Sequence, residues 1–240
     1  MDVHHHSHTA RKKWTHYFWE FLMLFLAVFC GFLAEYQLEH KIEREKGKQY
    51  VSSFYEDLKV DTSTLTGIIK EYKRKVEVLN GASVCFDSLE TQKELFDPCI
   101  ANLVWYSDGF PDFVYADRTL TQLKNAGGLR LLKQADADSV LVYDKMLRNF
   151  SLQEQTGFQG IQNRVRDAIV PLLNYKNLRL KKADPLVPFL FTANPEFINR
   201  YFVLIEGYKN SCVNNIEKLS QLKEKANSLI EYFKKKYHLK

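Results

Sequence analysis

Residues that interrupt regular structure and residues that perform catalysis are both scarce in this sequence. Only 10 glycines and 6 prolines occur among 240 residues, too few for the frequent turns of an all-β sandwich. Beyond position 40 a single histidine is left, His238, which argues against a His-based triad or a His-rich metal centre there. Gly127-Gly128 is too short for a phosphate loop, and Asp136 and Asp138 are interpreted as a solvated helix face. We therefore expect no enzyme activity, no cofactor and no metal.

Charge is nearly balanced along the chain. The 34 Lys and Arg residues exceed the 29 Asp and Glu residues by a formal net charge of +5, which gives little support to a nucleic-acid partner. Aromatic residues make up 14% of the chain, more than a disordered chain would carry, and the length allows one or two domains.

One long hydrophobic run stands out near the N-terminus, at residues 17–34, where Glu20 is the single charged residue. Its length of about 18 residues meets the lower bound for a transmembrane helix. Aromatic residues typical of the membrane interface cluster at its two ends: Trp14, Tyr17 and Trp19 at one end and Tyr36 at the other. We predict an uncleaved membrane span over residues 14–36. A cleaved signal peptide is the competing interpretation, but the run is too long and no small-residue cleavage site precedes the charged stretch from Glu35.

The orientation of the span in the membrane is harder to predict, because basic residues are about equally frequent on both sides of it. Cys85 and Cys99 lie in a connector where a disulfide would close a small loop, and such a bridge requires an oxidising compartment. Cys30 and Cys212 are interpreted as small core hydrophobes. Together with the short, basic, His-rich tail at residues 1–13, this favours a cytoplasmic N-terminus and a periplasm-like location for residues 37–240 of an inner-membrane protein.

Helical periodicity dominates the rest of the chain. A seam with 3–4 spacing runs from Val51 to Leu79, so the span is expected to continue as one helix to Asn80-Gly81. A second seam runs from Ile198 to Phe233, after a helix start at Asn194-Pro195. We predict that these two long helices pair antiparallel in an extended bundle. Shorter helices are expected at 116–132, 137–150 and 153–180, with connectors at 81–103 and 181–193. The predicted fold class is all-α.

Two blocks of sequence resemble a known group of proteins. The first comprises HHHSH at the start, HYFWEFLMLFLAVFCGFLAE and EHKIEREKGKQYVSSFYEDLKVD; the second is TLTQLKNAGGLRLL with the later Tyr143. They cover roughly residues 1–62 and 115–145. The chain resembles single-pass inner-membrane proteins common in Bacteroidota. The resemblance implies a helical periplasmic domain, and it assigns no activity and no site.

Two sets of residues are candidates for interaction. Exposed Trp and Tyr residues dominate interface energies, which makes a run of aromatic residues the best recognition candidate: Trp105, Tyr106, Phe110, Phe113 and Tyr115. The alternative is that these residues close the end of the bundle as a small core. In the span, Ala27, Gly31 and Ala34 form a small-residue stripe that permits close helix approach. Glu20 is interpreted as a boundary carboxylate within reach of His16, with inter-subunit hydrogen bonding or proton coupling as alternatives.

Taken together, these patterns predict a membrane-anchored structural or interaction protein, a scaffold or accessory subunit. Its expected partners are the lipid bilayer and either further copies of the chain or a membrane complex. The alternative is a sensor-like helical module that binds a small ligand and signals through a separate partner. A polar pocket in the bundle would favour the sensor, and a solid apolar core would favour the scaffold. The histidines at positions 4, 5, 6 and 8 form a flexible cluster from which no selective metal site is expected.

Overall fold

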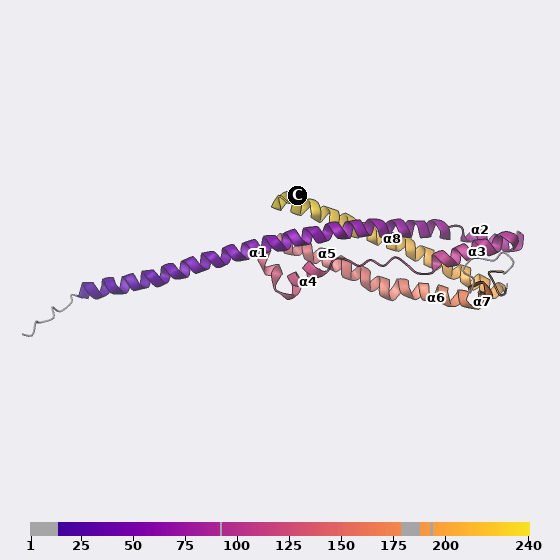
Figure 1. Ribbon diagram of the computed structural model, residues 1–240, viewed down its shortest axis with the longest axis horizontal. Helices are drawn as coiled ribbons and strands as arrows, with labels where there is room; N and C mark the ends of the chain where they lie inside the picture. Colours follow the sequence, from indigo (N-terminus) through magenta and orange to yellow (C-terminus); the bar gives the residue numbers. More distant parts are fainter. Residues whose placement is uncertain (1–13, 92, 179–187, 193) are drawn as a thin grey trace, which may run out of the picture. The chain divides into compact units, whose positions relative to one another are not determined.

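The computed structural model describes residues 14–91, 93–178, 188–192 and 194–240 (Figure 1). The described part is helical without strands, so the all-α prediction is confirmed. The helices are α1 (Trp14–Leu79), α2 (Ala82–Thr91), α3 (Lys93–Ser107), α4 (Arg118–Asn125), α5 (Gln134–Gln153), α6 (Gln159–Ile169), α7 (Tyr175–Leu178) and α8 (Pro195–Tyr237). Short 3-10 helices span Gly128–Leu131 and Val170–Leu172, and a π-helical turn spans Glu154–Phe158. The chain divides into two compact units, Met1–Gln49 and Tyr50–Lys240, so the division falls inside α1.

The first unit contains the apolar part of α1. Among the described residues, α1 is the one helix whose length and composition would allow it to cross a membrane, and none of its most apolar window is buried. The rings of Phe21, Phe25 and Phe29 stack along one side, with centroids 6.3 and 5.9 Å apart. His16 Nε2 lies 3.2 Å from Glu20 Oε1, the i−4 pairing that the sequence suggests. A helix with so much uncovered apolar surface needs an apolar environment from outside the unit.

The second unit is built on the two predicted seams. α8 buries every position of its seam from Ile198 to Phe233, and its N-cap, Asn194, accepts a hydrogen bond from the Glu196 N–H as expected. α1 buries its seam from Val51 to Leu79, with the half-buried Lys75 as the exception. Both helices end where the sequence indicates.

The two long helices run antiparallel within this unit. The Phe54 ring of α1 lies 6.0 Å from that of Phe233 in α8, and Asn215 Nδ2 donates to the Tyr72 hydroxyl at 3.2 Å. The same number of residues separates the two contacts on each helix, and the chain numbering runs in opposite directions. The predicted antiparallel pairing is therefore present.

A third helical rod packs beside the two long helices α1 and α8. α5 continues through the π-helical turn into α6, and this rod lies along α8 (Figure 1). The turn keeps both Glu154 and Phe158 buried, and the Phe158 ring packs on Tyr72 at 5.7 Å and on Tyr208 at 5.3 Å. α6 ends at Ile169, two residues before Pro171, which splits the stretch as expected.

The prediction of a connector over residues 81–103 is wrong, because α2 and α3 occupy this stretch. Pro98 lies inside α3, where it removes one backbone donor. Three apolar side chains of the hairpin formed by α2 and α3 are nevertheless buried in the core: Cys85 and Ile100 are 0% exposed, and Leu103 is 2% exposed. The sequence was misinterpreted because Asp and Pro were given more weight than this apolar spacing.

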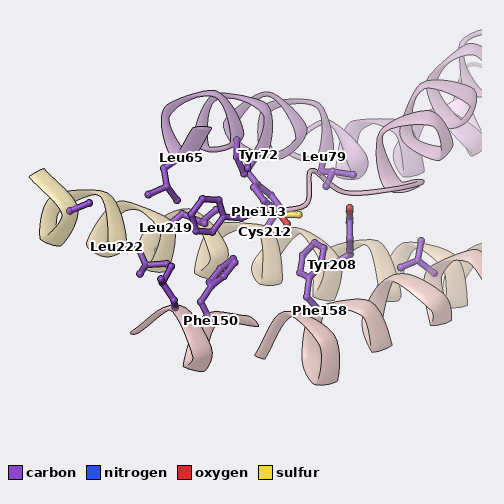
Figure 2. Packing of buried hydrophobic residues seen from close by; sticks show 14 of the residues in the cluster. Leu65, Tyr72, Leu79, Phe113, Phe150, Phe158, Tyr208, Cys212, Leu219 and Leu222 are labelled. Atoms are coloured by element: carbon purple, nitrogen blue, oxygen red, sulfur yellow. The ribbon is translucent and has the colours of Figure 1, made fainter. Parts of the chain in front are cut away.

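The fourth component of the bundle is not a helix but an extended stretch, residues 108–117, here called the linking segment. The Asp61 carboxylate of α1 accepts from the Ala116 N–H at 2.8 Å, and Tyr208 of α8 donates to the Gly109 carbonyl at 3.0 Å. Phe113, 4% exposed, lies between α1 and α5, with its ring 6.3 Å from that of Phe150 (Figure 2). The linking segment thus fills space between the three rods and closes the core.

Asp136, which the sequence placed on a solvated face, is 0% exposed. Its carboxylate accepts hydrogen bonds from Tyr232 at 2.8 Å, Lys236 at 2.6 Å and Tyr237 at 2.5 Å. Burial opposes ionisation here, but these three donors outweigh it and hold the pKa of Asp136 below its ordinary value. The cluster ties the start of α5 to the end of α8. The interpretation failed because the partners lie about a hundred residues further along the chain.

Replacing Asp136 by Asn should lower the free energy of unfolding by about 2–4 kcal/mol, because the charge that balances the partly buried Lys236 is lost. Because the folded-state pKa is depressed, the wild-type advantage should vanish as pH falls below about 4. Urea unfolding of the full chain in detergent measures both effects. The matched control is Asp138→Asn, two residues along the same helix and exposed. Equal destabilisation by the two variants would contradict the cluster's role.

Candidate interaction site

A groove of about 750 Å³ opens in the second unit, among α1, α3 and α6. The linking segment and the stretch around Leu173 and Phe189 also contribute to it. Leu173 forms an isolated antiparallel bridge with Leu190, the residue after Phe189, and the Phe191 N–H donates to the Leu172 carbonyl at 2.8 Å. The groove therefore has walls from several segments that lie far apart in the sequence.

The walls of the groove are largely apolar. Val104 and Trp105 come from α3, Val165 and Ile169 from α6, and Val170 and Leu173 from the chain that follows α6. Val165 is 1% exposed and belongs to the core, whereas Trp105 is 79% exposed. A large aromatic side chain held in the open beside a concave apolar surface is typical of binding sites.

Charged groups line the same groove. Lys75 donates to the carbonyls of Tyr106 and Gly109, both at 2.8 Å, and burial lowers its pKa. The Arg166 guanidinium lies 2.8 Å from the Asp108 carboxylate. Arg74 has its guanidinium 5.5 Å from the centre of the Tyr106 ring. Lys75 and Arg166 are therefore already paired by groups of the chain itself.

The five aromatic residues proposed for recognition separate into two groups. Trp105 and Tyr106, at the end of α3, line the groove. Phe110 packs on Phe158 at 5.1 Å, and Tyr115 lies 6.3 Å from the buried Phe113, so these three residues belong to the core. Phe110, Phe113 and Tyr115 of the linking segment therefore pack with the main core of the bundle and not as a separate small core at its end. Sequence reasoning missed Arg74 and Arg166, because nothing in their local sequence distinguishes them from ordinary solvated helix positions.

The candidate packing residues of the span are all exposed within the described chain: Glu20, Ala27, Gly31 and Ala34. A Cβ atom built on Gly31 would meet nothing within 4 Å. The stripe therefore remains open to lipid or to another helix, and its role stays a prediction.

Cys85 and Cys99 are joined as a disulfide between α2 and α3, with their Cα atoms 5.7 Å apart. Cys212 is buried in α8 as a small core residue, whereas Cys30 is exposed in the apolar part of α1. The bridge fixes the hairpin whose second helix carries Trp105. Its presence in cells stays a prediction, because it depends on the compartment.

A second polar feature lies in the π-helical turn. Glu154 is 6% exposed, and its Oε1 atom has no hydrogen-bond partner among the described residues. Burial, with the neighbouring Asp112 carboxylate of the linking segment, raises the pKa of Glu154 to about 7. Burial therefore favours the protonated form of Glu154 at pH values where an exposed carboxyl group is ionised.

Glu154→Gln should make the folded state less sensitive to pH. Between the ordinary carboxyl pKa and about 7 the folded wild type holds a proton that the unfolded chain has released, so its stability falls as pH rises. Relative to the Gln variant, the free energy of unfolding of the wild type should fall by about 2–3 kcal/mol between about pH 5 and pH 8. Denaturant titrations at several pH values measure this loss. Glu224→Gln, at an exposed position of α8, serves as the control, and an unchanged pH dependence in Glu154→Gln would refute the assignment.

No group of three or more His, Cys, Asp or Glu side chains within the described residues could hold a metal ion. His4, His5, His6 and His8 lie outside those residues. No family model, curated protein or solved structure matches the chain. The resemblance to single-pass membrane proteins of Bacteroidota therefore stays a prediction, and functional inference depends on the site itself.

Proposed function

We propose that this chain is a membrane-anchored interaction protein, a scaffold or accessory subunit of a membrane complex. The apolar part of α1 is its membrane span, and the unit Tyr50–Lys240 presents the groove to a partner. The observation that carries the proposal is the 79% exposed Trp105 beside a concave apolar wall, on a unit whose interior is filled by its own side chains.

The continuous apolar core favours the scaffold over the sensor. The core cluster runs through all three rods and consists of aliphatic and aromatic side chains, with the linking segment packed into it. The sensor remains the second candidate for one specific reason, which is that a groove of about 750 Å³ lies within the range of small-molecule sites.

We further propose that the span lies in the inner membrane, with residues 1–13 in the cytoplasm and the bulk of the chain in a periplasm-like space. The pairing of Cys85 with Cys99 supports this orientation, because a disulfide persists in an oxidising compartment. Self-association through Ala27, Gly31 and Ala34 is part of the same proposal, since these small residues are uncovered in the chain.

A membrane-impermeant thiol reagent tests the orientation in intact cells. In a Cys30→Ala background, Lys145→Cys should be labelled from outside the inner membrane and Thr9→Cys should be labelled only after lysis. Peptide mass spectrometry without reduction should find Cys85 bonded to Cys99. The reverse labelling pattern, or two free thiols, would defeat the orientation.

Photo-crosslinking in native membranes tests the function. A benzophenone amino acid at position 105 should capture a different protein, because Trp105 is the exposed wall of the groove. Val203 on α8 is 63% exposed but does not line the groove, so the same group there should capture little. At Gly31 the expected product is a dimer of the chain. Equal capture at positions 105 and 203 would remove the support for the groove as the partner site.

A further inference from the structure

The groove also carries a charge pattern that points to a class of ligand. Five charged residues line it within the described part of the chain: Glu71, Arg74, Lys75, Asp108 and Arg166. Three of them are cationic and two are acidic, so the lining has an excess of one positive charge. The internal contacts of these side chains determine which of the three cations can bind a ligand.

Two of the cations are already satisfied by the chain. Lys75 donates to carbonyls at the end of α3 and in the linking segment. Arg166 forms its ion pair with Asp108 at 2.8 Å. These contacts hold α3 and the linking segment against α1 and α6, so an anion at Lys75 or Arg166 would compete with the internal partner of that cation.

Arg74 differs from the other two cations. Its guanidinium lies 5.5 Å from the centre of the Tyr106 ring, a cation–π contact that uses no N–H donor in a hydrogen bond. Arg74 is exposed, and its donors suit an anionic oxygen. The apolar walls from Val104, Trp105 and Ile169 lie in the same groove.

We propose that this groove binds a small organic monoanion with an apolar body, whose anionic oxygens contact Arg74 while the body lies against Trp105. Among the described lining residues, Arg74 is the cation without a carbonyl or carboxylate partner, and their net charge of +1 favours a ligand with one negative charge over one with two. Glu71 lies one helical turn before Arg74 and opposes the anion, so it sets an upper limit on affinity. This inference does not depend on the protein partner proposed above.

Two dyes that differ by one charge test it. 1-Anilinonaphthalene-8-sulfonate carries the anion, and N-phenyl-1-naphthylamine has the same aromatic body without it. The full chain, reconstituted in zwitterionic nanodiscs with Trp14→Phe and Trp19→Phe, leaves Trp105 as the sole tryptophan donor. Energy transfer from Trp105 to the sulfonate dye should appear and saturate. A variant that also carries Trp105→Phe gives the background from lipid.

Two substitutions of the lining then have opposite predicted effects. Arg74→Gln should weaken binding of the sulfonate dye about three- to tenfold, and Glu71→Gln should strengthen it about two- to threefold. Neither should change binding of the neutral dye by as much as about twofold. Circular dichroism and thermal unfolding confirm that each variant is folded.

The outcomes separate cleanly. Absence of saturable transfer from Trp105, or equal effects of the two substitutions on both dyes, overturns the proposal. If the dye binds as expected and crosslinking at position 105 finds no protein, the ligand site stands and the partner proposal fails. If crosslinking succeeds and the dye does not bind, the reverse holds.

Discussion

Four buried tyrosines determine how the second unit fits together. Tyr72, Tyr143, Tyr201 and Tyr208 are all 0% exposed, and each hydroxyl has a hydrogen-bond partner on another element. The hydroxyl of Tyr72 is hydrogen-bonded to Asn215 and that of Tyr143 to Asp61. The hydroxyl of Tyr201 is hydrogen-bonded to Ser107 and that of Tyr208 to the Gly109 carbonyl. Burial raises the pKa of each, so all four stay neutral and able to donate. Because an unpaired buried hydroxyl is costly, each pair fixes the register of two elements.

The position of the groove follows from this constraint. The Tyr201 hydroxyl is hydrogen-bonded to Ser107, the last residue of α3, and the Tyr208 hydroxyl donates to the carbonyl of Gly109, two residues later. Lys75 adds hydrogen bonds to the same turn from α1. The end of α3 is therefore held from two sides, and Trp105 has a fixed base although its side chain is exposed. A rigid base of this kind lowers the entropy lost when an exposed aromatic residue binds a partner.

Local patterns in the sequence were enough to predict the long helices. The seam of α8 and the stop after Leu79 depend on residues three or four apart and on neighbouring caps, which a single sequence displays directly. The burial of Asp136 and the path of the linking segment depend on partners about a hundred or more residues away. The groove combines α1, α3 and α6, and no local signal joins Arg74 to Trp105 or Arg166. Predictions of this second kind require the tertiary structure.

The two units satisfy their apolar surfaces in different ways, and this difference supports the proposed role. The unit Tyr50–Lys240 has a continuous apolar core and also leaves several large side chains exposed, among them Trp105 beside the groove. The described part of the other unit leaves its aromatic residues, including the stacked Phe21, Phe25 and Phe29, uncovered by the chain. Under the proposed function, contact with lipid would account for the exposed apolar part of α1, and contact with a partner or ligand would account for the exposed Trp105.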